Sequence, residues 1–395
     1  MNIKELAEKY NDYIIKKRRE FHQNPELSFD EKWTTENLIN ELQNIGIETI
    51  VYDDLFGVIG IIKGGKKTGK TVMLRADIDA LPIVENTGLP FASQNIGKMH
   101  ACGHDAHMSM LLGAAKILYE IKDELSGDVK LLFQSGEESA HGADFYVKKG
   151  VLEGVDAIFG MHIWGTLEAP FINYEPGGRM ASCDIFKIII DGKSAHGSAP
   201  HQGNDAIIAA ASTVMNIQTM ISRFNDPLNS LVISVGTMKG GQRFNIIANH
   251  MEMEGTVRTF SNEIRFKIEE KMRKIVEDSA DILGCKGKLE YNYFLEPVIN
   301  NHDDLTTIAQ NAAIKLYGNE ILKDMPKLMG SEDFAYYMKE IPGIYGFIGA
   351  LNEKVGACYS NHNDKFTVDE NALHMGAALY AQFAYDFLAE KGGNK

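Results

Sequence analysis

The chain contains the stretch VMLRADIDALP at residues 72–82, where a short apolar run passes into a segment with two aspartates. The run at 72–74 predicts a strand. Working outward, similar runs predict strands at 57–62, 129–133 and 157–162. Apolar residues at helical spacing predict helices at 4–21, 31–45 and 108–121. Strands that alternate with helices predict an α/β layer with a mixed or parallel sheet.

The pattern changes after residue 182. Strands are predicted at 185–190, 231–235, 251–260 and 288–294. Helices are predicted at 205–221 and 263–283, which together indicate a small α+β sandwich of the usual domain size. Helix–strand alternation resumes at about 297 and ends in a long helix at 370–390. We therefore expect a mixed-sheet domain flanked by helices, formed by 1–182 and 297–395, with an inserted α+β domain at 183–296.

Composition and charge exclude several classes of protein. The net charge of −14, from 54 acidic and 40 basic residues, argues against a nucleic-acid partner, which needs clustered cations. No apolar stretch approaches the ~20 residues that cross a bilayer, and the polar first residues lack the apolar part of a signal peptide. The four cysteines have no paired spacing and indicate reduced thiols. We expect a cytoplasmic protein with no membrane partner.

Groups that bind metal or move protons gather in a few places along the chain. These segments are residues 75–82, 100–107, 134–138, 160–164 and 360–363. In an open α/β sheet, ligands bind outside the carboxyl ends of the strands, and three of the segments are expected at that edge.

The residue types in these segments suit a metal-assisted hydrolysis. Thiolate, imidazole and carboxylate together favour Zn²⁺, and imidazole with carboxylate also suits Mn²⁺ or Co²⁺. A metal lowers the pKa of bound water from ~15.7 towards ~7, so one of two adjacent glutamates can ligate metal while the other takes the proton. A lone histidine or a Glu-Glu pair is more often structural. The H-x-C-x-H-x-x-H cluster is harder to explain in that way.

In this order, the five segments resemble those of the metallopeptidase and aminoacylase family. This family contains carboxypeptidase G, aminoacylase, hippurate hydrolase and plant indole-acetyl-amino-acid hydrolases. The likeness runs from RREFHQNPEL at 18–27 to beyond His362. The amidohydrolase branch is the most similar, and its marks are DIDALP at 77–82, HACGHDAH at 100–107 and MGSEDF at 329–334.

The resemblance implies roles for single residues. Glu137 would be the catalytic base, and Asp79 would orient a ligand from behind. Elsewhere in the family a histidine ligand stands at the position of Asp77, so this branch moves ligation to the 100–107 segment. The implied metal ligands are Cys102, His104, Glu138, His162 and His362. No role follows for His100 or Asp105, and His107 is expected to pack or to support a ligand.

The inserted domain also resembles its counterpart in the family. The loop GKSAHGSAPH at 192–201 is similar to the dimerisation-domain loop, whose histidine, here His196, reaches into the active site of the partner subunit. Asn245 and Arg258 fall on positions that contact the substrate carboxylate. On spacing alone, His196 would be a solvated loop residue and Arg258 an ordinary strand-edge cation.

The resulting hypothesis is a homodimeric amidohydrolase with two divalent ions per subunit, Zn²⁺ or Mn²⁺, with Co²⁺ or Ni²⁺ also compatible. It would cleave N-acyl amino acids such as N-acetyl-amino acids or hippurate to a carboxylic acid and a free amino acid. Glu137 would deprotonate the metal-bound water, and His196 would stabilise the oxyanion. The alternatives are a dipeptidase or carboxypeptidase of the same fold, and a non-catalytic metal-binding dimer. The residues leave the preferred acyl group, the amino acid and the native metal open.

Overall fold

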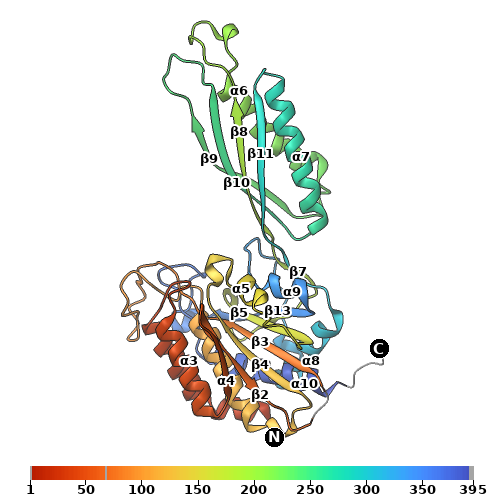
Figure 1. The fold of residues 1–395 in the computed structure, drawn as a ribbon. Coiled ribbons are helices and arrows are strands. Elements are labelled where there is room, and N and C mark those ends of the chain that lie inside the picture. The colour runs from red at the N-terminus through yellow and green to blue at the C-terminus, as the bar shows by residue number, and fades with distance from the viewer. Residues whose placement is uncertain (1, 67–68, 391–395) are drawn as a thin grey trace. The chain divides into compact units, whose positions relative to one another are not determined.

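The computed structural model describes residues 2–66 and 69–390 (Figure 1). The chain forms two compact units. The first comprises Met1–Gly177, Ile299–Pro326 and Asp333–Lys395, and the second comprises Gly178–Val298 and Lys327–Glu332. No helix within the described ranges is long and apolar enough to cross a membrane.

The described part of the first unit contains a seven-stranded mixed sheet. In spatial order its strands are β1 (Glu48–Tyr52), β2 (Leu55–Ile62), β4 (Asp128–Gln134), β3 (Thr71–Asp77), β5 (Ala157–Glu168), β13 (Gly343–Leu351) and β6 (Ile172–Asn173). The pairs β4–β3, β3–β5 and β5–β13 are parallel, and the outer pairs are antiparallel. This confirms the predicted mixed sheet.

Strand β5 is longer than the sequence predicted. The expected end at His162 is wrong, because the strand runs on to Glu168. The cause is β13, which pairs with it through Phe347↔His162, Ile348↔Ile163 and Gly349↔Trp164. His162 therefore lies inside a paired strand, in which the residues before and after it also pair with β13.

Helices flank this sheet. Their bounds are α1 (Ile3–Lys9), α2 (Asn11–Gln23), α3 (Lys32–Ile45), α4 (His104–Glu120), α5 (Gly142–Lys148), α8 (Asp303–Tyr317), α9 (Ala335–Glu340) and α10 (Asn371–Ala389). Helices α4 and α10 pack against each other and against β3, whereas α5 and α9 pack together on β4 and β13. Helix α4 is buried almost all round, which fits its run of alanine, leucine and methionine.

The single helix predicted at 4–21 is wrong. The chain breaks at Tyr10, whose ψ of 3° is not helical. Helix α1 then packs mainly on α10 and α2 mainly on α4, so each buries its apolar face against a different partner. A continuous helical repeat of apolar residues does not show where the chain changes from one packing partner to another.

The second unit has a four-stranded antiparallel sheet within residues 178–298, all of which the structure describes. In spatial order the strands are β11 (Lys286–Leu295), β8 (Cys183–Asp191), β10 (His250–Thr259) and β9 (Leu231–Gly240). Helices α6 (Ala206–Phe224) and α7 (Asn262–Asp281) pack on it around a separate apolar core. Strands β7 (Gly177–Met180) and β12 (Val298–Asn300) form a short ladder of their own.

Candidate metal centre

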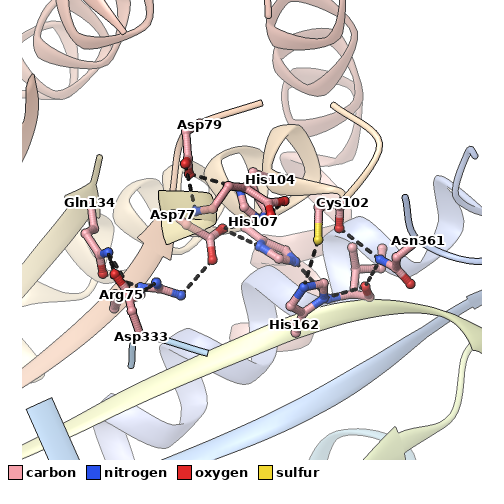
Figure 2. A network of polar contacts seen from close by, with 12 residues as sticks. Arg75, Asp77, Asp79, Cys102, His104, His107, Gln134, His162, Asp333 and Asn361 are labelled. Atoms are coloured by element: carbon pink, nitrogen blue, oxygen red, sulfur yellow. Dashed lines mark hydrogen bonds and ion pairs between the residues drawn. The ribbon is translucent and has the colours of Figure 1, made fainter. Parts of the chain in front are cut away.

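The donor side chains of the first unit gather at one edge of its sheet (Figure 2). The parallel neighbours β3 and β4 end at Asp77 and Gln134, so the segments that carry Asp79 and Glu138 follow at the same edge. His104 begins helix α4, which packs on both strands. This placement follows the rule that ligands collect beyond the carboxyl ends of parallel strands.

Cys102 lies at the centre of the cluster. Its Sγ is 3.4 Å from Nε2 of His162 and 3.3 Å from Nε2 of His362. Among the residues that the structure describes, Cys102 belongs to two groups whose donor atoms lie within 4.8 Å of one another: one with His104 and His162, the other with Glu138 and His362. The five predicted ligands therefore come together, and the thiolate stands where the two groups meet.

The histidine rings are oriented by contacts behind them. Nδ1 of His162 donates to the carbonyl oxygen of Ile163 at 2.7 Å, which leaves Nε2 directed towards Cys102. Nδ1 of His104 is 3.3 Å from Oδ1 of Asp79, and its Nε2 lies 4.0 Å from Oε1 of Glu138. The hydrogen bond behind His162 fixes the tautomer of that ring, which is the usual support of a metal-binding imidazole.

Asp79 contacts two of the predicted ligands at once. Besides facing His104, it accepts hydrogen bonds on Oδ2 from the backbone N–H of Glu138 at 2.9 Å and from the Ser28 hydroxyl at 2.7 Å. It is almost completely buried. One carboxylate thus sets the positions of an imidazole and of the turn that carries both glutamates.

The donors are suited to a cation. Nε2 of His104 and Oε1 of Glu138 are buried and make no hydrogen bond to any described residue. Burial raises the pKa of Glu138 to about 7, with Asp79 adding to the rise and His104 opposing it. Burial and the carboxylates of Glu138 and Glu137 raise the pKa of Cys102 well above its usual value. Burial therefore penalises the anionic forms of these donors, and a bound cation would offset that penalty. The S, N and O set fits a borderline divalent metal.

Glu137 lies in a short 3₁₀ turn, Glu137–Ser139, and its side chain is close to His104 and Glu138. The turn is fixed from below by buried Glu31, which accepts hydrogen bonds from Ser135 Oγ at 2.7 Å and from the Gly136 N–H at 3.1 Å. The segment before the turn is therefore held by two hydrogen bonds to one buried carboxylate.

A buried ionic chain behind the donors was not predicted from the sequence. Arg75 donates from Nη1 to Asp77 at 2.6 Å and from Nη2 to Asp333 at 2.9 Å, and its Nε donates to Gln134 at 2.8 Å. Burial favours neutral Asp77, but His104, Arg75 and His107 outweigh it and hold the pKa of this carboxyl well below its usual range. An arginine within an apolar strand was the available signal, because a buried guanidinium needs carboxylate partners.

Both ring nitrogens of His107 make hydrogen bonds. Its Nδ1 donates to Oδ1 of Asp77 at 2.5 Å, and its Nε2 accepts the backbone N–H of Ile163 at 2.8 Å. Both ring nitrogens are therefore used, although Asp77, His104 and His107 also lie close enough together to form a candidate group. The contact with Ile163 braces β5 next to His162.

His196, Asn245 and Arg258 belong to the second unit. His196 is exposed, and its Nδ1 accepts the backbone N–H of Ser198 at 3.2 Å and lies 2.7 Å from the Ser198 hydroxyl. The backbone N–H of Gly197 donates to the carbonyl of Asn245 at 2.8 Å, which joins the two loops. Arg258 donates from Nη1 to Ser331 Oγ at 3.1 Å.

Comparisons with known proteins agree with this site. The chain matches the model of Peptidase family M20/M25/M40 over residues 73–386. It is 38% identical over 388 residues to thermostable carboxypeptidase 2 of Saccharolobus solfataricus, covering 98% of each chain. It is 38% identical to N-acetylcysteine deacetylase of Bacillus subtilis, over 96% of this chain and 98% of the relative. It is 36% identical to IAA-amino acid hydrolase ILR1-like 4 of Arabidopsis thaliana, over 96% and 86%.

A solved structure extends the likeness to the fold. The YXEP protein of Bacillus subtilis, described as a dinuclear metal binding peptidase from the M20 family, matches with a TM-score of 0.87. The two are 36% identical, and the match covers 96% of this chain and 99% of that one. These matches confirm the resemblance inferred from the motifs. Together with the grouped donors, they support the expected pair of divalent ions.

Proposed function

The chain belongs to peptidase family M20/M25/M40, and from that premise we propose that it hydrolyses the amide bond of N-acyl amino acids. The products would be a carboxylic acid and a free amino acid. The observation that carries the proposal is the convergence of five donors, with Cys102 at their centre and Glu137 beside them. The N-acetylcysteine deacetylase and the IAA-amino acid hydrolase among the relatives support this substrate class.

Each donor group would hold one ion. Cys102, His104 and His162 form one group, Cys102, Glu138 and His362 form the other, and the thiolate is common to both. Two divalent ions bound there would polarise the amide carbonyl and acidify the attacking water. The soft thiolate favours Zn²⁺, while the imidazole and carboxylate donors also suit Mn²⁺, Co²⁺ or Ni²⁺.

Glu137 is the proposed general base. As Glu138 is committed to a donor group, its neighbour can take the proton of the attacking water and return it to the leaving nitrogen. A carboxylate has the required two-way role because it is a base before the attack and an acid after it. Asp79 and Glu31 hold the turn that carries this residue.

His196 is the proposed donor to the oxyanion. Because Nδ1 accepts the Ser198 N–H, the ring proton is on Nε2, and this nitrogen can donate. We propose that it does so in the active site of a partner subunit. We propose that Arg258 and Asn245 bind the substrate's α-carboxylate, because a planar guanidinium can donate two hydrogen bonds to a carboxylate.

A homodimer through the second unit is supported by its exposed apolar surface. Ile208 and Met215 on α6 are 54% and 66% exposed, and Val232 and Met238 on β9 are 39% and 43% exposed. Strand β9 is at the edge of its sheet and offers unpaired backbone groups to another strand. An apolar face next to an open edge is typical of a pairing surface.

A peptidase is the second candidate, because the thermostable carboxypeptidase is as similar as the deacetylase. A substrate screen with the metal-loaded enzyme separates the two. We expect turnover of N-acetyl-methionine or hippurate to exceed that of dipeptides, and to cease with a chelator. Elemental analysis should give about two ions per chain. Faster cleavage of dipeptides would favour the peptidase, and activity in protein shown to be free of metal would contradict the site.

The same screen tests whether the substrate's α-carboxylate is bound. If Arg258 and Asn245 bind the α-carboxylate, the carboxamide of N-acetyl-methionine should lose ~2–5 kcal/mol of transition-state binding, as when a buried charge is left unpaired. Equal rates on the acid and its carboxamide would exclude this role for Arg258.

A further inference from the structure

The side chain of Asn361 makes three hydrogen bonds at the candidate metal centre. Figure 2 shows it beside Cys102. Its Oδ1 accepts the backbone N–H of Gly165 at 2.9 Å. Its Nδ2 donates to the carbonyl oxygens of Cys102 at 2.9 Å and of Ile163 at 3.2 Å. An amide has two N–H donors and one carbonyl acceptor, so each of its polar groups has a partner.

The partners of this amide are segments that carry metal donors. One is the backbone of Cys102 itself. Another is the carbonyl of Ile163, which also accepts Nδ1–H of His162 and so fixes the tautomer of that ring. The third donor segment is the one that contains Asn361 itself, because His362 is the next residue. The backbone N–H of His362 donates to the carbonyl of Ala101 at 2.7 Å. One side chain thus connects the backbones around Cys102, His162 and His362.

His362 needs such support more than the other donors do. Its side chain is 56% exposed, so burial does not hold it in place. Its φ of 67° lies in the left-handed region, which is unfavourable for a residue with a Cβ. A strained conformation persists only where surrounding contacts determine it. Even so, its Nε2 is within 3.5 Å of both Cys102 Sγ and Glu138 Oε1.

We propose that Asn361 is a positioning residue that sets the spacing of Cys102, His162 and His362 and thereby the affinity of the centre for its ions. This deepens the proposed function and rests on it for the ligand roles of the three residues. Asn361 touches backbone and not the reacting atoms, so its effect is on metal binding first and on turnover through the metal.

Two substitutions isolate the hydrogen bonds. Asn361→Ala removes all three. Asn361→Asp keeps the shape and the acceptor for Gly165 but cannot donate to the carbonyls of Cys102 and Ile163. The matched control is Asn363→Ala on the same loop. Among the described residues, the Asn363 side chain accepts one hydrogen bond, from the N–H of Lys365 at 2.9 Å.

The measurement is Zn²⁺ and Co²⁺ affinity by competition with a chelator, on full-length protein. Loss of a group that orients metal ligands typically costs 10–100-fold in affinity, and we expect this loss in both Asn361 variants but not in Asn363→Ala. The Co²⁺ protein should also show a weaker thiolate-to-metal charge-transfer band, because Cys102 is displaced. Melting of the metal-free proteins shows whether a variant is folded. If Asn361→Ala is not folded, the metal affinity of Asn361→Asp decides the test.

Wild-type affinity and an unchanged Co²⁺ spectrum in the folded Asn361 variants would overturn the proposal. Failure of the proposed function has a different signature. A wild-type protein that binds two ions and cleaves no N-acyl amino acid would refute the substrate assignment, while the affinity comparison would still test Asn361.

Discussion

Adjacent residues in one turn have different surroundings. Glu138 has its backbone N–H held by Asp79 and its Oε1 3.5 Å from Nε2 of His362, within the donor group around Cys102. Glu137 precedes it and lies near His104 without belonging to that group. In the proposed function, these different surroundings would let one carboxylate bind metal while the other moves a proton.

Two substitutions test that division. Glu137→Gln should keep both ions and lose several orders of magnitude in turnover, because it removes only the base. Glu138→Gln should lose metal affinity first, since a neutral amide is a poor ligand in a buried anionic site. Metal content and single-turnover rates measure the two effects separately. Near-normal rates and full metal content in both variants would show that the base has been misassigned.

At this scale the sequence predicted residue types better than connections. The five donors stand in short motifs, and the structure brings them together; their roles as ligands remain predictions until metal is measured. Arg75, Asp333 and Asn361 went without roles because, apart from Asp77 two residues after Arg75, the partners named above lie 59 to 259 positions away in the chain. No local spacing carries that information, although a charge inside an apolar strand such as β3 indicates that a partner exists.

Among the elements, helix α4 begins in close contact with strand β5. Gly103, its N-cap, separates the donors Cys102 and His104 and has φ of 93°. A Cβ built there would be 2.5 Å from Cγ2 of Ile163, the residue after His162. Glycine at this position therefore lets the helix begin directly against strand β5.

Gly103→Ala should destabilise the metal-free protein by about 2–4 kcal/mol. The left-handed backbone contributes about 1–2 kcal/mol and the overpacking the rest. Gly97→Ala is the matched control, because its φ is 85° but no atom lies within 4 Å of the added Cβ. Urea unfolding of both variants gives the difference, and Co²⁺ affinity should fall only for Gly103→Ala. Equal stability losses would mean that Ile163 yields at no cost.

The elements also show where periodicity is insufficient. In the second unit, helices α6 and α7 and strands β8, β10 and β11 were predicted to within a few residues, because each has one buried and one exposed face. Strand β9 runs five residues beyond its predicted end at 235, and β7 was not predicted. The break at Tyr10 and the continuation of β5 to Glu168 depend on α10 and β13, which come far later in the chain. The local sequence pattern predicts which face of an element is buried. The packing partner of the element determines where the element ends.

On the scale of the whole molecule, the central question is whether two subunits share each active site. Glu137→Ala and His196→Ala should each be nearly inactive as homodimers. If His196 acts in the partner's site, one site of each mixed dimer has both residues intact. Random exchange gives half mixed dimers, so the mixture should recover roughly a quarter of wild-type activity by symmetry.

The control for this mixture is a tagged pull-down, which must show that subunits have exchanged. Arg258 and Asn245 are intact in both parents, so recovery depends on His196 and Glu137 alone. Activity no higher than that of the parents, in a mixture that contains heterodimers, would place His196 in its own chain's site or outside any site.

The first unit is formed by segments that lie far apart in the sequence, so its donor residues are synthesised at different times. Four of its donors are made by residue 162, but the fifth is His362, which is 200 residues later (362 − 162). At about 5–20 residues per second of synthesis, the interval is roughly 10–40 s. During that time a nascent chain has neither β13 to pair with β5 nor the loop of Asn361 to fasten Cys102. Until His362 and the segment around it are made, the Cys102 thiol therefore lacks two of the contacts that surround it in the folded chain.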